Sequence, residues 1–179
     1  MLVIHPTDPT TTFLRALYED REDVRVLHGQ ESKKELSKIL FHLKPGEPIY
    51  LLGHGNDQGL FRLQDGVNTL YVGRSMAYSL RKHPVIGIFC HASVFAEQQG
   101  LHGLFSGMII SEESEAEDDM YKIKTSKEEL ENENTRFAKL LAGFLSAGLP
   151  FPEIPVMMQK AVEDGPAVRF FNYNSLYVL

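Results

Sequence analysis

Short apolar runs alternate with longer amphipathic stretches along the first half of the chain. Four runs that are rich in β-branched or aromatic residues and lie near Pro or Gly are typical of strands, at residues 2–4, 24–27, 49–52 and 85–89. Between the first three runs, residues 10–20 and 32–43 place apolar side chains at helical spacing, which predicts two amphipathic helices. Strands that are apolar on both faces and alternate with helices indicate a parallel sheet covered by helices. We therefore expect an α/β fold.

The pattern changes after the third predicted strand. Residues 59–63 and 67–72 are separated by a segment that contains Asp65-Gly66, a dipeptide that favours the tight turn of a β-hairpin. A short helix at residues 74–82 follows and ends before Pro84. The sequence therefore predicts a β-hairpin inserted between the third strand and this helix.

The second half of the chain predicts two more strands and two more helices. In chain order they are a strand at residues 108–110, a helix at 127–147, a helix near 156–163 and a strand around 168–173. The most acidic stretch, residues 111–119, is interpreted as a solvated loop. Because no repeat or linker interrupts the pattern, we expect a single domain over residues 1–179.

The composition narrows the range of partners and compartments. The chain has 179 residues and a formal net charge of −6, and its densest basic run is Lys33-Lys34, which argues against nucleic acid or an anionic membrane as a main partner. Its one cysteine, Cys90, excludes an intramolecular disulfide and a Cys-based metal site. The sequence shows no signal-peptide pattern and no apolar segment of about 18 residues. We expect a cytoplasmic protein without a membrane partner.

Two of the predicted strands run directly into chemically reactive residues. The third continues into Gly53-His54-Gly55, and the fourth continues into Cys90-His91. Functional groups gather beyond the carboxyl ends of parallel strands, so His54 and Cys90 would share one edge of the sheet if their strands are neighbours. A thiol, an imidazole and the backbone N–H groups of a glycine-containing turn are the components of covalent catalysis. A helix that starts after Cys90 would also favour the thiolate.

This order of motifs resembles that of the caspase-like cysteine peptidases. The residues of the two motifs, Leu52-Gly53-His54-Gly55 and Cys90-His91-Ala92-Ser93, are most similar to those of the metacaspases. The resemblance covers residues 1–147 in topology, including the predicted hairpin, and implies a three-layer sandwich of the caspase or flavodoxin type. Residues 111–119 are similar in position to the linker that caspases cleave on activation.

The resemblance also implies an activity and a role for each matching residue. It implies hydrolysis of a peptide bond in a peptide or protein substrate, with Cys90 as nucleophile and His54 as general acid and base. The N–H groups of Gly55 and Cys90 would form the oxyanion hole. Such sites use no metal and no organic cofactor.

The motifs depart from both subfamilies in the residues around the nucleophile. Caspases carry Gln-Ala-Cys-x-Gly there, so their specificity for aspartate is not implied for this chain. Metacaspases carry an Asp where this chain has Ile88. Further candidates for substrate binding are Asp57 and Arg62, which follow the histidine closely, and His91. The alternatives for these three are exposed loop positions for the first two and a capping or packing role for His91.

Three functional hypotheses remain open from the sequence. The first is a cysteine peptidase that uses His54 and Cys90. The second is a catalytically inactive caspase-like or flavodoxin-like module that binds a partner or small ligand at the same rim, and an inert, buried Cys90 would mark it. The third is another kind of hydrolase that uses His54 with Asp57 or Ser93. Ser93 is also predicted as the N-cap of the helix after Cys90.

Overall fold

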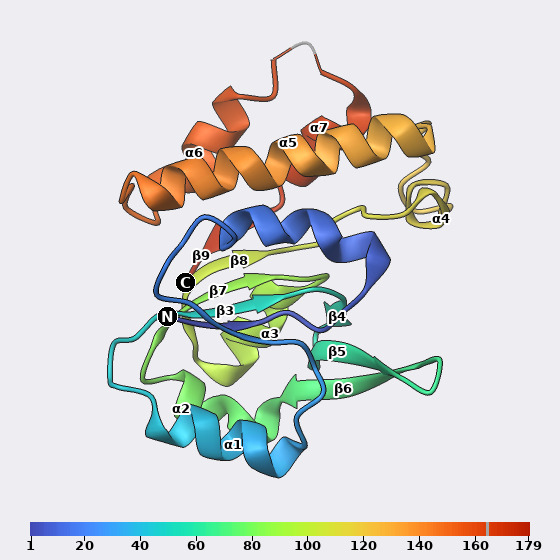
Figure 1. Ribbon diagram of the computed structural model, residues 1–179. Coiled ribbons are helices and arrows are strands. Elements are labelled where there is room, and N and C mark those ends of the chain that lie inside the picture. Colours follow the sequence, from blue (N-terminus) through green and yellow to red (C-terminus); the bar gives the residue numbers. More distant parts are fainter. Residues whose placement is uncertain (164) are drawn as a thin grey trace.

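The computed structural model describes residues 1–163 and 165–179. Within them, six strands form a central sheet in the order β2-β1-β3-β7-β8-β9 (Figure 1). The strands are β1 (Leu2–Ile4), β2 (Arg25–Leu27), β3 (Ile49–Leu52), β7 (Pro84–Ile88), β8 (His102–Ser106) and β9 (Leu176–Val178). Only β9 pairs antiparallel with its neighbour. The expected α/β fold with a mostly parallel sheet is confirmed.

Helices cover both faces of this sheet, as Figure 1 shows. One face carries the 3-10 helix η1 (Pro9–Leu17) together with α5 (Lys127–Ser146), α6 (Glu153–Lys160) and α7 (Ala167–Tyr173). The other face carries α1 (Lys33–His42), η2 (Arg74–Met76), α2 (Ala77–Leu80) and α3 (Ala92–Gln99). The short α4 (Glu113–Ala116) lies beyond the end of β8. The result is a three-layer arrangement of helices, sheet and helices.

The core is divided between the two faces because successive strand residues point in opposite directions. In β1, Val3 packs into the cluster that contains Phe137 of α5, whereas Leu2 and Ile4 pack into the cluster that contains Leu36 of α1. All three residues of β1 are fully buried. This two-sided burial explains why β1 and β3 are apolar at every position.

The inserted hairpin is present where the sequence predicts it. Strands β5 (Gly59–Gln64) and β6 (Val67–Gly73) pair antiparallel, and β4 (Gly55–Asn56) adds a third short strand. Asp65 and Gly66 connect β5 to β6 with φ values of 53° and 76°. Positive φ at both central residues is the geometry that an Asp-Gly hairpin turn adopts.

The strand predicted at residues 108–110 is wrong, because the fifth parallel strand is β8, about five residues earlier. Gly103 makes this strand hard to recognise in the sequence, because glycine is uncommon within strands. The structure requires glycine there, since a Cβ at this position would collide with the backbone of Val85 in β7. Residues 108–110 continue beyond the strand as an extended segment. Ile110 in this segment is held by the side chain of Asn172, which bonds both its N–H and its C=O.

The strand predicted around residues 168–173 is also wrong. This segment forms α7, which places Val168, Asn172 and Tyr173 in buried positions at helical spacing. The last strand is β9 instead. Helix α6 begins earlier than predicted, at Glu153, because a proline is tolerated in the first turn of a helix, where its missing N–H needs no partner.

Candidate functional site

His54 and Cys90 follow two neighbouring strands of the sheet. Strands β3 and β7 pair in parallel, with Leu52 opposite Ile88 at their carboxyl ends. One residue further on, the Gly53 N–H donates to the Ile88 carbonyl (3.1 Å) and carries the pairing past the end of the strands. His54 and Cys90 then line the same small pocket, whose free volume of about 10 Å³ is close to what one water molecule needs. The strands that precede His54 and Cys90 are therefore neighbours in the sheet, which the sequence alone could not establish.

A tight turn presents Cys90 between β7 and α3. The buried Ser106 hydroxyl accepts from the Phe89 N–H (3.0 Å) and donates to the Phe89 carbonyl (2.7 Å), which fixes the backbone just before the cysteine. His91 takes the left-handed conformation with φ of 62°, and its N–H donates to the Gly107 carbonyl (2.9 Å). Among the described residues, no oxygen or nitrogen atom of another residue accepts from the Cys90 N–H.

The thiol of Cys90 is half-buried and hydrogen-bonded. It donates to the Ile109 carbonyl, with 3.4 Å between sulfur and oxygen. Burial raises the pKa of Cys90 to about 11, and the negative charge of Glu115 acts in the same direction. At pH 7 roughly one thiol in ten thousand is then ionised. The sequence predicts that the helix after Cys90 favours the thiolate, but burial keeps the thiol neutral.

The imidazole of His54 contacts the N-terminal 3-10 helix. Its Nε2 lies 2.7 Å from the Thr10 hydroxyl oxygen, and the Thr10 hydroxyl donates to Asp8 Oδ1 (2.6 Å). Carboxylate oxygens of Asp8 and Glu112 lie 3.6 and 3.8 Å from the same nitrogen. Within the part of the chain that the structure describes, no hydrogen bond joins His54 to Cys90. The imidazole is therefore held from the side of Thr10.

Gly55 needs to be glycine for a steric reason. A Cβ at this position would come within 2.5 Å of the Phe89 ring, directly before the cysteine. The Phe61 N–H donates to the His54 carbonyl (2.8 Å), and this bond makes Gly55 and Leu60 a pair without mutual hydrogen bonds. The Gly55 N–H consequently points away from β5 and is not used by the β4–β5 ladder.

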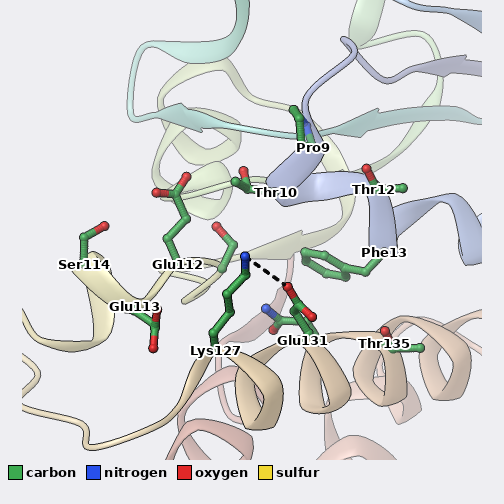
Figure 2. Close-up of a pocket in the computed structure, with 12 residues that line it drawn as sticks. Pro9, Thr10, Thr12, Phe13, Glu112, Glu113, Ser114, Lys127, Glu131 and Thr135 are labelled. Carbon is green, nitrogen blue, oxygen red and sulfur yellow. Dashed lines mark ion pairs between the residues drawn. The ribbon is translucent and has the colours of Figure 1, made fainter.

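A larger cleft opens beside the small pocket. It has a volume of about 690 Å³, within the usual range for ligand sites, and lies between η1, residues 111–114 and the first turns of α5 (Figure 2). Phe13 and Ser111 line both the cleft and the small pocket. Figure 2 also shows the ion pair between Lys127 and Glu131 (3.9 Å) at its rim. The cleft and the small pocket are therefore direct neighbours.

Arg62 and Asp57, two of the further candidates for substrate binding, lie away from His54 and Cys90. Arg62 donates to the carbonyls of Gly29 and Glu31 and stacks 4.9 Å over the ring of Tyr71, which are structural roles. Asp57 lies in the turn between β4 and β5. Neither residue lines the small pocket or the cleft.

His91 and Ser93 are also placed differently from the predictions. His91 is exposed, occupies the N-cap position of α3 without a capping bond from its side chain, and lines neither hollow. The prediction that Ser93 is this N-cap is wrong, because Ser93 lies within the first turn. The helix starts earlier because the left-handed turn at His91 already completes the change of direction.

Sequence reasoning missed the residues that surround His54. Asp8 and Thr10 precede it by more than forty positions, and Glu112 follows it by nearly sixty. The Asp8-Pro9 pair is a recognisable start of a helix, since Asp is a favoured N-cap and Pro a favoured first residue. That signal reveals the helix but not what its side chains contact.

No protein-family model matches the chain, and no curated protein matches it significantly. Across residues 1–163 and 165–179, no helix is long and apolar enough to cross a membrane. The same residues contain no group of three or more His, Cys, Asp or Glu side chains that could hold a metal ion.

Proposed function

We propose that the protein is a cysteine peptidase of the caspase-like type, which cleaves peptide bonds with His54 and Cys90. One observation carries the proposal: both side chains line one small pocket beyond the adjacent carboxyl ends of β3 and β7. The hairpin inserted between these strands and the mostly parallel sheet agree with the sandwich that the motif resemblance implies. The sheet forms the scaffold, and the loops beyond it supply the reacting groups.

The reaction begins from a neutral thiol. Because burial raises the pKa of Cys90 to about 11, the proton leaves during attack and passes to His54. The sulfur forms a bond to the carbonyl carbon of the substrate, and the carbonyl oxygen takes up the negative charge. The N–H groups of Gly55 and Cys90, which have no partner in the adjacent ladder or turn, donate to this oxygen.

The second half of the reaction returns the proton. His54 gives it to the leaving amine as the peptide C–N bond breaks, and a thioester to Cys90 remains. Water, deprotonated by His54, then attacks the thioester and releases the carboxylic acid with the thiol restored. No other co-reactant is needed.

Substrate binding has to release the thiol before attack. The bond from Cys90 to the Ile109 carbonyl is long and its donor is a weak one, so a peptide that enters from the cleft competes with it at small cost. Phe13 and Ser111 connect the cleft with the small pocket and define the path of entry.

The test is cleavage of a mixture of peptides, with the products identified by mass spectrometry. The wild-type protein should cleave a defined subset, and Cys90→Ala and His54→Ala should abolish that cleavage. His102→Ala is the matched control, because His102 is exposed at the opposite end of the sheet, and it should cleave as the wild type does. Cleavage that persists in Cys90→Ala, or its absence from correctly folded wild type, would refute the proposal.

A non-catalytic module that binds a ligand at the same rim is the second candidate. The observation in its favour is the neutral, hydrogen-bonded thiol, which makes no bond to His54. Under this alternative, peptides bind in the cleft equally well in wild type and Cys90→Ala, and neither protein cleaves them.

A further inference from the structure

The start of η1 forms a chain of hydrogen bonds that ends on His54. Asp8 caps this 3-10 helix, and its Oδ1 accepts from the Thr10 N–H (2.9 Å) and from the Thr10 hydroxyl (2.6 Å). The hydroxyl oxygen of Thr10 in turn lies 2.7 Å from Nε2 of His54. Capping of the helix needs only the bond from the Thr10 N–H to Asp8. The two bonds of the Thr10 hydroxyl connect the Asp8 carboxylate to the His54 imidazole.

The direction of each bond in this chain can be derived. Burial alone would raise the pKa of Asp8, but the hydrogen bonds from Thr10 lower it, and His54 lowers it further when its ring is protonated. Asp8 is thus ionised at neutral pH and can only accept hydrogen bonds. The single hydroxyl hydrogen of Thr10 points to Asp8, so the hydroxyl oxygen can only accept from His54. The hydrogen of the neutral imidazole therefore lies on Nε2, and the lone pair lies on Nδ1.

We infer that Asp8 and Thr10 are positioning residues for His54, which fix its ring and its tautomer so that Nδ1 is the basic nitrogen. This inference deepens the proposed peptidase function, and its kinetic consequence rests on that function. A general base needs a defined tautomer, and a third group that holds the base is a recurrent feature of activated nucleophiles. During attack on a substrate, the thiol proton of Cys90 passes to Nδ1.

The same chain stabilises the charged imidazole that this transfer creates. Asp8 Oδ1 and Glu112 Oε1 lie 3.6 and 3.8 Å from Nε2, the nitrogen that does not take up the thiol proton. Each of the three side chains is partly shielded from water, with His54 and Asp8 about one-fifth exposed. The two carboxylates attract the positive charge that the imidazole takes up during the transfer.

Magnetic resonance of the His54 ring tests the inference without any need for peptidase activity. Long-range ¹H–¹⁵N spectra, assigned by the signals lost in His54→Gln, should show the hydrogen on Nε2 as a ring N–H protected from exchange. Thr10→Val should abolish this protected signal and Thr10→Ser should restore it. Thr12→Val, which removes a hydroxyl bonded only to the Asp8 carbonyl in the same helix, should leave the signal unchanged. Hydrogen found on Nδ1, or a signal that survives in Thr10→Val, would overturn the inference.

Kinetics provide the second readout and separate the two proposals. With a cleaved peptide, Thr10→Val should lower kcat roughly tenfold or more, and Thr10→Ser should recover most of kcat. Asp8→Asn keeps a good N-cap and removes the charge, so it should lower kcat even if Thr10→Val folds poorly. Unchanged kcat in both variants would overturn the positioning role and leave the peptidase intact. A protected Nε2–H in a protein that cleaves nothing would refute the peptidase and leave the positioning intact.

Discussion

The thiol of Cys90 is predicted to react slowly with small alkylating reagents at neutral pH. Burial raises its pKa to about 11, whereas a cysteine in an unfolded chain ionises near 8.5. This difference leaves roughly 300-fold less thiolate in the folded protein at pH 7, and the thiolate is the reactive form. Iodoacetamide should therefore modify the native protein about 10² times more slowly than the protein in guanidinium. Intact mass measures both rates on the single thiol.

The pH dependence of the two rates makes this prediction specific. The denatured rate should level off above about pH 8.5, whereas the native rate should continue to rise about tenfold per pH unit until the protein unfolds. Glu115→Gln should speed the native reaction a few-fold, because it removes a negative charge that helps to raise the pKa of Cys90. A native rate equal to or above the denatured rate at pH 6 would refute the reasoning. That result would mean a preformed thiolate, and His54 would not have to remove a proton.

Three further predictions concern stability. Burial lowers the pKa of His5 to about 4, whereas an unfolded histidine ionises near 6.5, so the unfolded state binds more protons between these two pH values. The free energy of unfolding, measured by urea titration, should therefore fall by about 3 kcal/mol as the pH falls from about 6.5 to 4. His5→Gln should flatten that slope. Asn172→Ala leaves both backbone groups of Ile110 unpaired in the core and should cost about 2–4 kcal/mol; a loss below about 1 kcal/mol contradicts this account. Gly55→Ala places a methyl group 2.5 Å from both the Phe89 ring and the Gly59 carbonyl oxygen and should cost about 1–3 kcal/mol in thermal unfolding, whereas an unchanged midpoint would contradict this account.

Local patterns were enough to predict much of the fold. Strands β1 and β3 are continuous apolar runs, because both faces of the sheet are covered there, and Asp65-Gly66 specifies its own turn. The segments that were misassigned depend on distant contacts. Gly103 is part of a strand because it packs against the backbone of β7. Residues 168–173 have strand-like side chains but pack as a helix against α5.

The residues of the candidate site likewise include some that local sequence patterns indicate and some that only distant contacts bring together. His54 and Cys90 could be proposed from sequence, since each follows an apolar run, and the neighbouring positions of β3 and β7 bring them to one pocket. Thr10 could not be proposed from the sequence, because no local pattern indicates that the first turn of η1 contacts His54. The neutral state of the thiol was not predictable either, since it follows from burial, which depends on the whole fold.

The most direct test of the central claim is a mass-spectrometric map of where a peptide electrophile attaches. A set of short peptides that end in an acyloxymethyl ketone is incubated with wild type, His54→Ala and Cys90→Ala, and the modified residue is identified. The account predicts that a subset of these peptides labels Cys90 faster than iodoacetamide does, that His54→Ala slows the labelling at least about tenfold, and that Cys90→Ala is not labelled. Labelling of Cys90 only after unfolding, or at the same rate without His54, would contradict it.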